Sequence, residues 1–385
     1  MPSSVLRRVP AAAAAGVVAL VLASCSSPGG TDPAPSTSGT ASGDLCADGP
    51  AAQLVDSLDG MSADERETTL AEQAAATRGG AIDWYTEIND PQPFVDAFED
   101  TYDGVTVNVY RAGSDQIRQR IIEESAANFA GADLVEMDSL EMATLDQEGL
   151  LTKASSSHLD ELSEAAKGFE HFIGDRFSYI LPVWNTTLLA PEDVPKSFED
   201  LADPRFKGKL AVESSDVLWF AGLVLHMEEE DGMTEDEAVE VFRKVVANAT
   251  MTSGHTTTAE LVVAGQYAIN ANGYVHRALI LKDENAPVEF APINVPIVPE
   301  ITAVGMLCLS DNPAGALLLQ DFILSPEGQQ IFVDDHRTPA NEEMAQQTLG
   351  GIDADPIPVD VIAVARDYTK WSDLWNDVVR EGSQG

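Results

Sequence analysis

Residues 310–341 read SDNPAGALLLQDFILSPEGQQIFVDDHRTPAN and predict two consecutive helices. Asp311 or Asn312 can cap the first helix, whose first turn contains a proline, and apolar residues follow at helical spacing. Ser325, Pro326 and Glu327 then repeat the cap, the proline and the acidic first turn for a second helix. These patterns predict two short packed helices but no chemistry.

The amino terminus has the pattern of a bacterial lipoprotein signal peptide. Arg7 and Arg8 precede an apolar stretch over residues 11–22 that is too short for a membrane span, and residues 22–25 read Leu-Ala-Ser-Cys, the lipobox pattern. We therefore expect residues 1–24 to be removed and Cys25 to be acylated, which would anchor the exported chain by lipid to the outer face of the bacterial cell membrane. An ordinary secretory signal with a chance cysteine is the alternative. Residues 25–49 predict a flexible tether rich in Ser, Gly, Thr and Pro.

The charge balance excludes two classes of partner. The 385 residues carry 22 Lys and Arg against 64 Asp and Glu, which gives a net charge of -42. Such a field repels nucleic acid and anionic membrane surfaces, so we expect no nucleic-acid partner and no membrane contact beyond the lipid anchor. The charge could favour a cationic ligand, although the solvated acidic surface of an exported protein accounts for it more simply.

The chain contains three cysteines. With Cys25 assigned to lipid, Cys46 and Cys308 remain, and two such thiols outside the cytoplasm often pair. Cys308 lies in an apolar run and could equally be a small buried core residue. A Cys46–Cys308 disulfide is therefore one of two interpretations.

Strands and helices alternate in the first half of the chain. Strands are expected at residues 81–87, 105–113 and 131–137, with helices between them, which predicts a parallel sheet covered by helices. Ligands of open α/β sheets bind beyond the carboxyl ends of the strands. The candidate ligand-binding residues at these ends are Thr86, Glu87, Ser114, Asp138 and Ser139. Helix capping is their alternative role.

Two helix starts in the second half supply further candidates. Ser215 and Asp216 precede an apolar helix, and Trp219, one turn into it, could line a cleft or belong to the core. Thr257 lies at a helix start rich in hydroxyl groups, which would suit a carboxylate or phosphate. A capping box of Thr257 with Glu260 is the alternative.

Three segments resemble those of bacterial extracellular solute-binding proteins, the receptors that feed ABC importers. They are the helix pair that contains LSPEGQ, the apolar run over residues 177–189 with Asn185 and Thr186, and SFEDLADPRFKGKLAV over residues 197–212. The resemblance spans about residues 50–340 and implies an α/β, two-lobed type II periplasmic-binding-protein fold with a hinge between the lobes. It divides the chain into a first part of lobe 1 (residues 50–183), lobe 2 (184–299) and a return to lobe 1 (300–385), whose C-terminal helix is expected to pack on lobe 1. The resemblance adds Asn185 to the candidate ligand-binding residues.

The sequence around Tyr274 gives information on the chemical class of the ligand. Ferric-ion-binding members of this family carry two consecutive tyrosines at this place, whereas this chain has Tyr274, Val275 and then His276. Because one tyrosine is missing, an organic or oxyanion ligand is favoured over bare ferric ion. Tyr274 could contact an organic ligand, or it could help Glu87 or Asp138 to coordinate iron as a transported metal. Tyr274 and His276 complete the candidate site.

The chain has no signature of catalysis. Its six histidines form no HExxH motif, and the sequence contains no GxSxG elbow and no P-loop. The resemblance implies a monomeric substrate-binding component, without a cofactor, that closes on a small solute and delivers it to a permease and its ATPase. A surface sensor of the same fold that is not coupled to transport is the second alternative.

Overall fold

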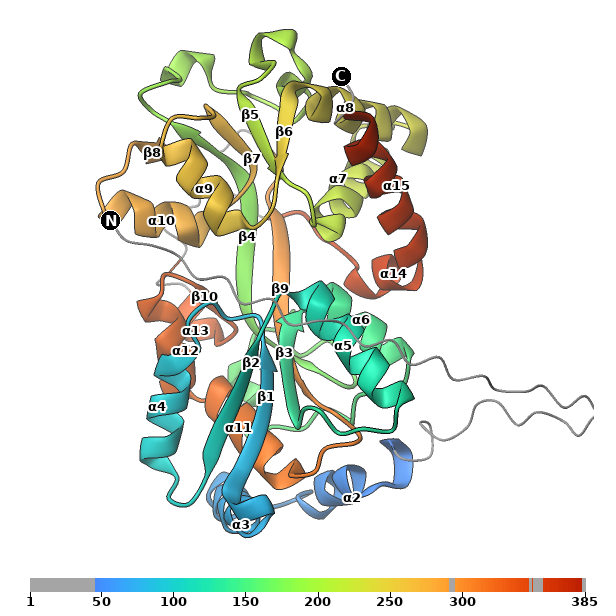
Figure 1. Ribbon diagram of the computed structural model, residues 1–385, viewed down its shortest axis with the longest axis vertical. Helices are drawn as coiled ribbons and strands as arrows, with labels where there is room; N and C mark the ends of the chain where they lie inside the picture. The colour runs from blue at the N-terminus through green and yellow to red at the C-terminus, as the bar shows by residue number, and fades with distance from the viewer. Residues whose placement is uncertain (1–45, 291–294, 346–347, 349–355, 383–385) are drawn as a thin grey trace, which may run out of the picture. The chain divides into compact units, whose positions relative to one another are not determined.

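The computed structural model describes residues 46–290, 295–345, 348 and 356–382, which belong to one compact α/β unit (Figure 1). The ten strands within these residues form one sheet in the order β2-β1-β3-β9-β4-β7-β5-β6, with β8 and β10 paired to β4. No helix in this described part is long and apolar enough to cross a membrane.

Lobe 1 contains a parallel sheet in which β1 lies between β2 and β3. Its strands and helices are β1 (Ala81–Thr86), β2 (Thr106–Arg111), β3 (Leu134–Asp138), β10 (Thr338–Pro339), α2 (Pro50–Ser57), α3 (Ala63–Ala76), α4 (Gln92–Thr101), α5 (Ser114–Ala126), α6 (Ser139–Gln147), α11 (Pro313–Leu324), α12 (Pro326–Asp334) and α13 (Glu342–Ala345). The predicted pair of helices after residue 310 is confirmed as α11 and α12. Asn312 and Ser325 cap them by accepting hydrogen bonds from Gly315 N and Gly328 N.

Lobe 2 repeats this arrangement with β5 paired in parallel to β6 and β7. Its elements are β5 (Leu210–Glu213), β6 (Ala249–Thr252), β7 (Ile269–Tyr274), β8 (Val288–Glu289), α7 (Val217–Glu230), α8 (Glu235–Asn248), α9 (His255–Val263) and α10 (Val275–Asp283). A capping box of Thr234 and Glu237 begins α8.

Two long antiparallel strands connect the lobes: β4 (Ile173–Asn185) and β9 (Val298–Met306). In lobe 1, β9 pairs with β3, and in lobe 2, β4 pairs with β7 (Figure 1). The register of β4 against β7 shifts between Leu181 and Val183. Pro182 lies at this shift, and because proline has no backbone N–H it interrupts the ladder there.

The C-terminal segment contradicts one prediction. After α14 (Val361–Arg366), which packs on α6 of lobe 1, the helix α15 (Tyr368–Gly382) packs mainly on α7 and α8 of lobe 2 and touches lobe 1 at Tyr368 (Figure 1). Trp375 stacks on Phe220 with ring centroids 5.1 Å apart and meets Trp219 edge-on at 6.0 Å. The prediction was wrong because α7 is buried around nearly its whole circumference and needs an apolar cover on its outer side, which α15 provides.

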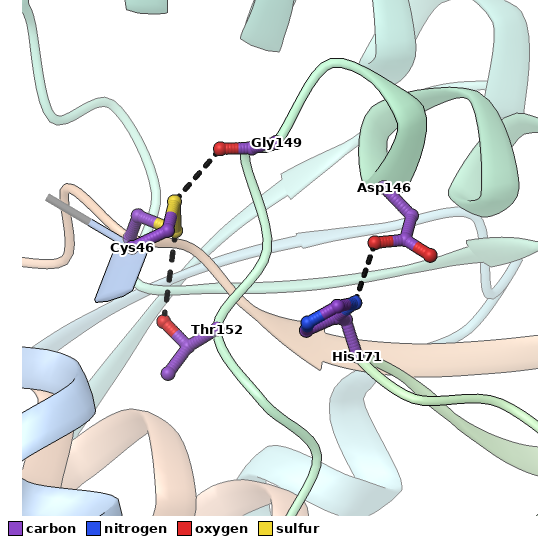
Figure 2. Close-up of a disulfide and its surroundings, with 6 residues drawn as sticks. Cys46, Asp146, Gly149, Thr152 and His171 are labelled. Atoms are coloured by element: carbon purple, nitrogen blue, oxygen red, sulfur yellow. Dashed lines mark hydrogen bonds and ion pairs between the residues drawn. A yellow bond between two sulfur atoms is a disulfide. The ribbon is translucent and has the colours of Figure 1, made fainter. Parts of the chain in front are cut away.

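Figure 2 shows the disulfide between Cys46 and Cys308. It joins the chain just before α2 to the residues after β9, 262 positions away. The hydroxyl of Thr152 donates to the sulfur of Cys308. Of the two interpretations of these cysteines, the structure has the disulfide. The signal peptide, Cys25 and the tether up to residue 45 lie outside the described residues.

Candidate functional site

A cavity of about 530 Å³ lies between the lobes. Lobe 1 contributes the ends of β1, β2 and β3 and the starts of α5 and α6, and lobe 2 contributes the starts of α7, α9 and α10. The N-cap residues of α5, α7 and α9 (Gly113, Asp216 and Gly254) make no side-chain capping hydrogen bond. The positive ends of three helix dipoles therefore face a cavity whose side chains are mainly polar.

Carboxylates dominate the lining. Seven acidic residues face the cavity: Glu87, Asp115, Asp138, Glu141, Glu213, Asp216 and Glu300. Three arginines and two histidines accompany them: Arg111, Arg277, Arg337, His255 and His276. Each arginine is engaged by the protein itself. Arg277 pairs with Glu260 at 3.5 Å, Arg337 pairs with Asp335 at 2.7 Å, and Arg111 donates to the backbone carbonyl of Glu87 at 3.1 Å.

In lobe 1, a strand end and a helix start hold Asp138. The hydroxyl of Ser114 donates to Asp138 Oδ2 at 2.7 Å, and the backbone N–H of Asp138 donates back to Ser114 Oγ at 3.2 Å. Burial, and then the nearby carboxylates of Glu300 and Glu87, raise the pKa of Asp138 well above its usual value. Burial and the charge of Asp138 likewise raise the pKa of Glu141. These two groups are therefore poised to hold protons where no cation compensates them.

A buried arginine organises the base of this wall. Arg176 on β4 has a fully buried side chain and forms ion pairs with Glu87 and Glu136, and its Nη1 lies 3.4 Å from Asp175 Oδ1. The hydroxyl of Thr86 also donates to Glu136. Thr86 thus belongs to this network beneath the cavity, and Glu87 connects the network to the cavity lining.

In lobe 2, the side chain of Glu213 links two loops by hydrogen bonds. Its carboxylate accepts hydrogen bonds from the backbone N–H and the hydroxyl of Ser215, both at 2.7 Å, and from the N–H of Gly254 at 3.1 Å. These contacts fix the start of α7 against the start of α9. Thr257 lies in the first turn of α9, whose N-cap is Gly254, so the proposed capping box of Thr257 with Glu260 is not formed.

Asp216 and His255 form a buried ion pair next to Glu213. Asp216 Oδ1 lies 2.9 Å from His255 Nε2, and Asp216 Oδ2 accepts from the side-chain amide of Asn272 at 2.5 Å. Burial alone would lower the pKa of His255, but the charges of Asp216 and Glu213 raise it to about 10. Burial raises the pKa of Asp216 to about 6, against the opposing effect of His255. Asp216 therefore holds an imidazolium instead of capping α7.

Tyr274 stacks on two imidazole rings. Its ring centroid is 3.8 Å from that of His255 and 5.1 Å from that of His276, and both pairs are stacked. Its hydroxyl donates to Glu300 on β9. Burial and the charge of Asp216 raise the pKa of Glu300 to about 8, while burial and the neighbouring arginines, Arg337 first, lower that of His276. This arrangement links lobe 2 to a strand that crosses between the lobes.

The structure brings eight of the predicted residues into the cavity lining: Glu87, Ser114, Asp138, Ser215, Asp216, Thr257, Tyr274 and His276. The other four, Thr86, Ser139, Asn185 and Trp219, are buried outside it. Ser139 begins α6 inside lobe 1, and the amide of Asn185 donates to the backbone carbonyl of Val262 at 2.8 Å. Trp219 packs edge-on against Phe198 and Phe242 in the core of lobe 2. Thr86 and Asn185 thus serve buried hydrogen bonds and Trp219 serves packing, whereas the buried hydroxyl of Ser139 has no hydrogen-bond partner within the described residues.

The prediction missed several lining residues, above all Glu213, His255 and Glu300. Glu213 ends a strand and His255 begins a helix, so the strand-end rule that selected their neighbours could have found both. Glu300 lies inside β9, and the sequence offers no local signal for it. Ligand atoms of Glu213, Asp216 and His255 all lie within 4.8 Å of one another, which is close enough for one metal ion.

Residues 132–354 match the family model described as bacterial extracellular solute-binding protein. The chain belongs to this family. It is 21% identical over 249 residues to "Iron uptake protein A1" of Synechocystis sp., a match covering 60% of this chain and 68% of that protein. The fold is similar to iron-bound HitA from Pseudomonas aeruginosa (TM-score 0.65, 20% identity, 77% of this chain and 99% of that chain). It is also similar to AfuA from Actinobacillus pleuropneumoniae with fructose-6-phosphate bound (TM-score 0.69, 21% identity, 78% and 99%).

These findings confirm the predicted family and the two-lobed fold. Proteins of this family are exported solute receptors and not enzymes, and they serve as the substrate-binding components of ABC importers, together with a permease and an ATPase. The fold of this solute-binding protein is shared by proteins whose named ligands differ, iron in one and a sugar phosphate in another. The fold therefore does not determine the ligand, which depends on the side chains of the cavity.

Proposed function

We propose that this solute-binding protein captures a positively charged organic solute between its lobes and delivers it to its permease. The observation that carries the proposal is the excess of seven carboxylates over three arginines in the lining. Arg277 and Arg337 already pair with acids, and the carboxyl groups of Asp138, Glu141 and Glu300, whose pKa values are raised, can give up their protons when a cation binds, so the cavity can present a negative field to a cation.

The starts of α5, α7 and α9 would favour an anion, but Glu213 already accepts from the N–H groups of Ser215 and Gly254 at two of them. The acids of the lining oppose a free oxyanion, so we keep the organic part of the sequence-based expectation and leave out the oxyanion part.

Tyr274 lines the cavity, and its ring and hydroxyl are fixed by His255, His276 and Glu300. Because the ring already stacks on the two imidazoles, Tyr274 can offer a ligand its hydroxyl oxygen, which accepts a hydrogen bond from an ammonium or guanidinium group. The acids of the lining can contact the same group.

The positions of the acids suggest how binding closes the lobes. Asp138 and Glu141 belong to lobe 1, Asp216 belongs to lobe 2, and Glu300 lies on the crossing strand β9. A cation that contacts both walls gains its full binding energy only when the walls approach each other. Ligand therefore shifts the population toward the closed form, which the permease recognises.

Ferric ion is the second candidate. Glu213, Asp216 and His255 offer ligand atoms within 4.8 Å of one another, and Tyr274 stacks directly on His255. Iron in its ferric form prefers anionic oxygen ligands, which this part of the cavity supplies. Relatives are named for iron, which supports this candidate, whereas the absence of a second consecutive tyrosine counts against it.

Thermal unfolding of the mature chain with Cys25→Ser would test the proposal. The probes are amino acids, polyamines and other amines, with ferric citrate, sugars, phosphonates and sugar phosphates for comparison. A ligand at a hundred times its dissociation constant adds about 2.7 kcal/mol to stability, so an organic cation should raise the Tm clearly. A shift confined to phosphonates or sugar phosphates would overturn the proposal. A shift with ferric citrate alone, with a visible charge-transfer band that Tyr274→Phe removes, would favour the second candidate.

Asp138→Asn should weaken or abolish the shift caused by a cation, because the amide cannot release a proton and present a negative charge when the cation binds. Glu164→Gln is the matched control, since the side chain of Glu164 is 92% exposed on the surface. Equal shifts in the two variants would remove Asp138 from the site.

We also propose that Cys25 carries the lipid anchor and that the protein acts as a monomer. The lipobox pattern and the polar residues after it support the anchor. The intact mass of the membrane-extracted protein tests it, since an unmodified Cys25 would exclude acylation.

A further inference from the structure

The C-terminal segment, residues 357–382, contacts both lobes, and we call it the C-terminal strap. It starts at the crossing strands, where Ile357 N donates to the carbonyl of Ile297 at 2.9 Å. Its helix α14 then packs against α6 of lobe 1 and α7 of lobe 2 (Figure 1). Val361 and Val364 are buried there in the same apolar cluster that contains residues of both lobes.

The fit of the strap to α7 is close. A Cβ atom added to Gly222 would lie 3.0 Å from Val359 Cγ2, closer than most real contacts of this kind. A glycine at this position in α7 therefore lets the strap approach the helix directly. The strap packs into the junction of the two lobes.

Tyr368 connects the strap to the lobe 1 wall of the cavity. Its hydroxyl donates to Asp115 Oδ1 at 3.3 Å, and the guanidinium of Arg118 lies 5.1 Å from the centre of its ring. Both partners are on α5, and Asp115 lines the cavity. A displacement of α15 relative to α5 would break these contacts.

Trp375 connects the strap to the opposite wall. Its indole N–H donates to the backbone carbonyl of Ser214 at 2.8 Å. Ser214 lines the cavity and precedes Ser215 and Asp216 in the loop that starts α7. One helix, α15, thus contacts a lining residue of each wall.

We propose that the C-terminal strap is a third connection between the lobes, beside β4 and β9, and that Tyr368 and Val364 are positioning residues that set the separation of the cavity walls. Movement of one lobe against the other must rearrange the packing of α14 and the contacts of Tyr368. The strap therefore biases the equilibrium between open and closed forms, and with it the fraction of molecules competent to bind. An effect of the strap on solute affinity rests on the proposed function. Its role as a connection between the lobes does not depend on that function.

The distance between the lobes tests the strap without any ligand. In the mature chain with Cys25→Ser and the native disulfide intact, spin labels at Asp100→Cys on α4 and Asp236→Cys on α8 report this distance by pulsed electron paramagnetic resonance. Both positions are exposed, one in each lobe. We expect Val364→Ala and Tyr368→Phe each to produce a longer-distance population that the parent chain lacks.

Tyr102→Phe is the matched control, because Tyr102 donates to Glu67 at 2.8 Å entirely within lobe 1. It should leave the distance distribution unchanged. A strap that only stabilises lobe 2 would lower the urea midpoint in Val364→Ala and leave all distributions superimposable. That result would overturn the proposal and leave the proposed ligand class untouched.

Discussion

The two walls of the cavity hold their carboxylates in different ways. In lobe 1, the buried guanidinium of Arg176 pairs with Glu87 and Glu136. In lobe 2, Glu213 is held by backbone N–H groups, and Asp216 is held by the imidazole of His255. One wall thus depends on a permanent charge and the other on a titratable one.

This difference shows which carboxyl groups of the cavity respond most to a bound charge. The three acids around Arg176 raise its pKa against the effect of burial, so its guanidinium stays charged at all working pH values. Within the described residues neither Asp138 nor Glu141 forms an ion pair with a basic side chain, and burial raises their pKa values. A cationic ligand would compensate these groups most strongly, whereas the lobe 2 wall already carries its own cation, His255.

Arg176→Met should have the largest effect. It removes the shared cation and leaves Glu136 and Asp175 buried without it, a change that costs about 3–5 kcal/mol for buried pairs. Urea unfolding at neutral pH measures the loss. Arg205→Met is the control, since the side chain of Arg205 is 47% exposed, and its pair with Asp203 at 3.7 Å should contribute at most about 1 kcal/mol. Equal losses would mean that the lobe 1 network is not held by Arg176.

Asp216→Asn should have an intermediate effect. The change keeps the shape of the side chain but removes the charge that stabilises the imidazolium of His255, so burial should then lower the pKa of His255 from about 10. Stability should fall by about 1–3 kcal/mol because a buried charged hydrogen bond is weakened. An NMR titration of the His255 ring measures the pKa. An unchanged titration would assign the raised pKa to Glu213, which lies 3.9 Å from the same ring nitrogen.

The sequence predicts the features that local chemistry determines. The helices α11 and α12 were predictable because their caps and prolines lie within a few residues of each helix start. The lining residues Ser114, Asp138 and Ser215 were predictable because the end of a strand and the start of the next helix define an edge of the sheet. The same rule could not separate Thr86 from Glu87, since only the tertiary fold decides which of two neighbours faces Glu136 and which faces the cavity.

The remaining features depend on contacts between distant parts of the chain. Arg176 pairs with Glu136 and Glu87, which are 40 and 89 residues away in the sequence. No local sequence pattern therefore predicts this network. Trp219 lies on a helix that is apolar around nearly its whole circumference, and the sequence therefore cannot say which side faces the cavity. The placement of α15 on lobe 2 depends on the same helix, because its outer apolar face is what Trp371 and Trp375 cover.

Glu300→Gln should have the smallest effect, and it tests the strand between the two walls. The folded-state pKa of Glu300 is about 8, above its ordinary value of 4.5, so the folded protein retains a proton that the unfolded chain releases between these values. The contribution of Glu300 to the free energy of unfolding is fully present below about pH 4.5. It is lost as the pH rises toward 8, with a slope of at most about 1.4 kcal/mol per pH unit. Glutamine can still accept the hydroxyl of Tyr274 but does not titrate.

Urea unfolding of Glu300→Gln and of the parent chain between about pH 5 and 6.5 should therefore show a shallower fall in the variant. This window is the cleanest because His255, with a folded-state pKa of about 10, adds its own loss of stability only above its ordinary value of 6.5, and does so in both proteins. Parallel pH profiles would show that Glu300 is already ionised in the folded state. Burial and the charge of Asp216 would then not hold a proton on Glu300, and Glu300 would stand as a negative charge at the centre of the cavity before any ligand binds.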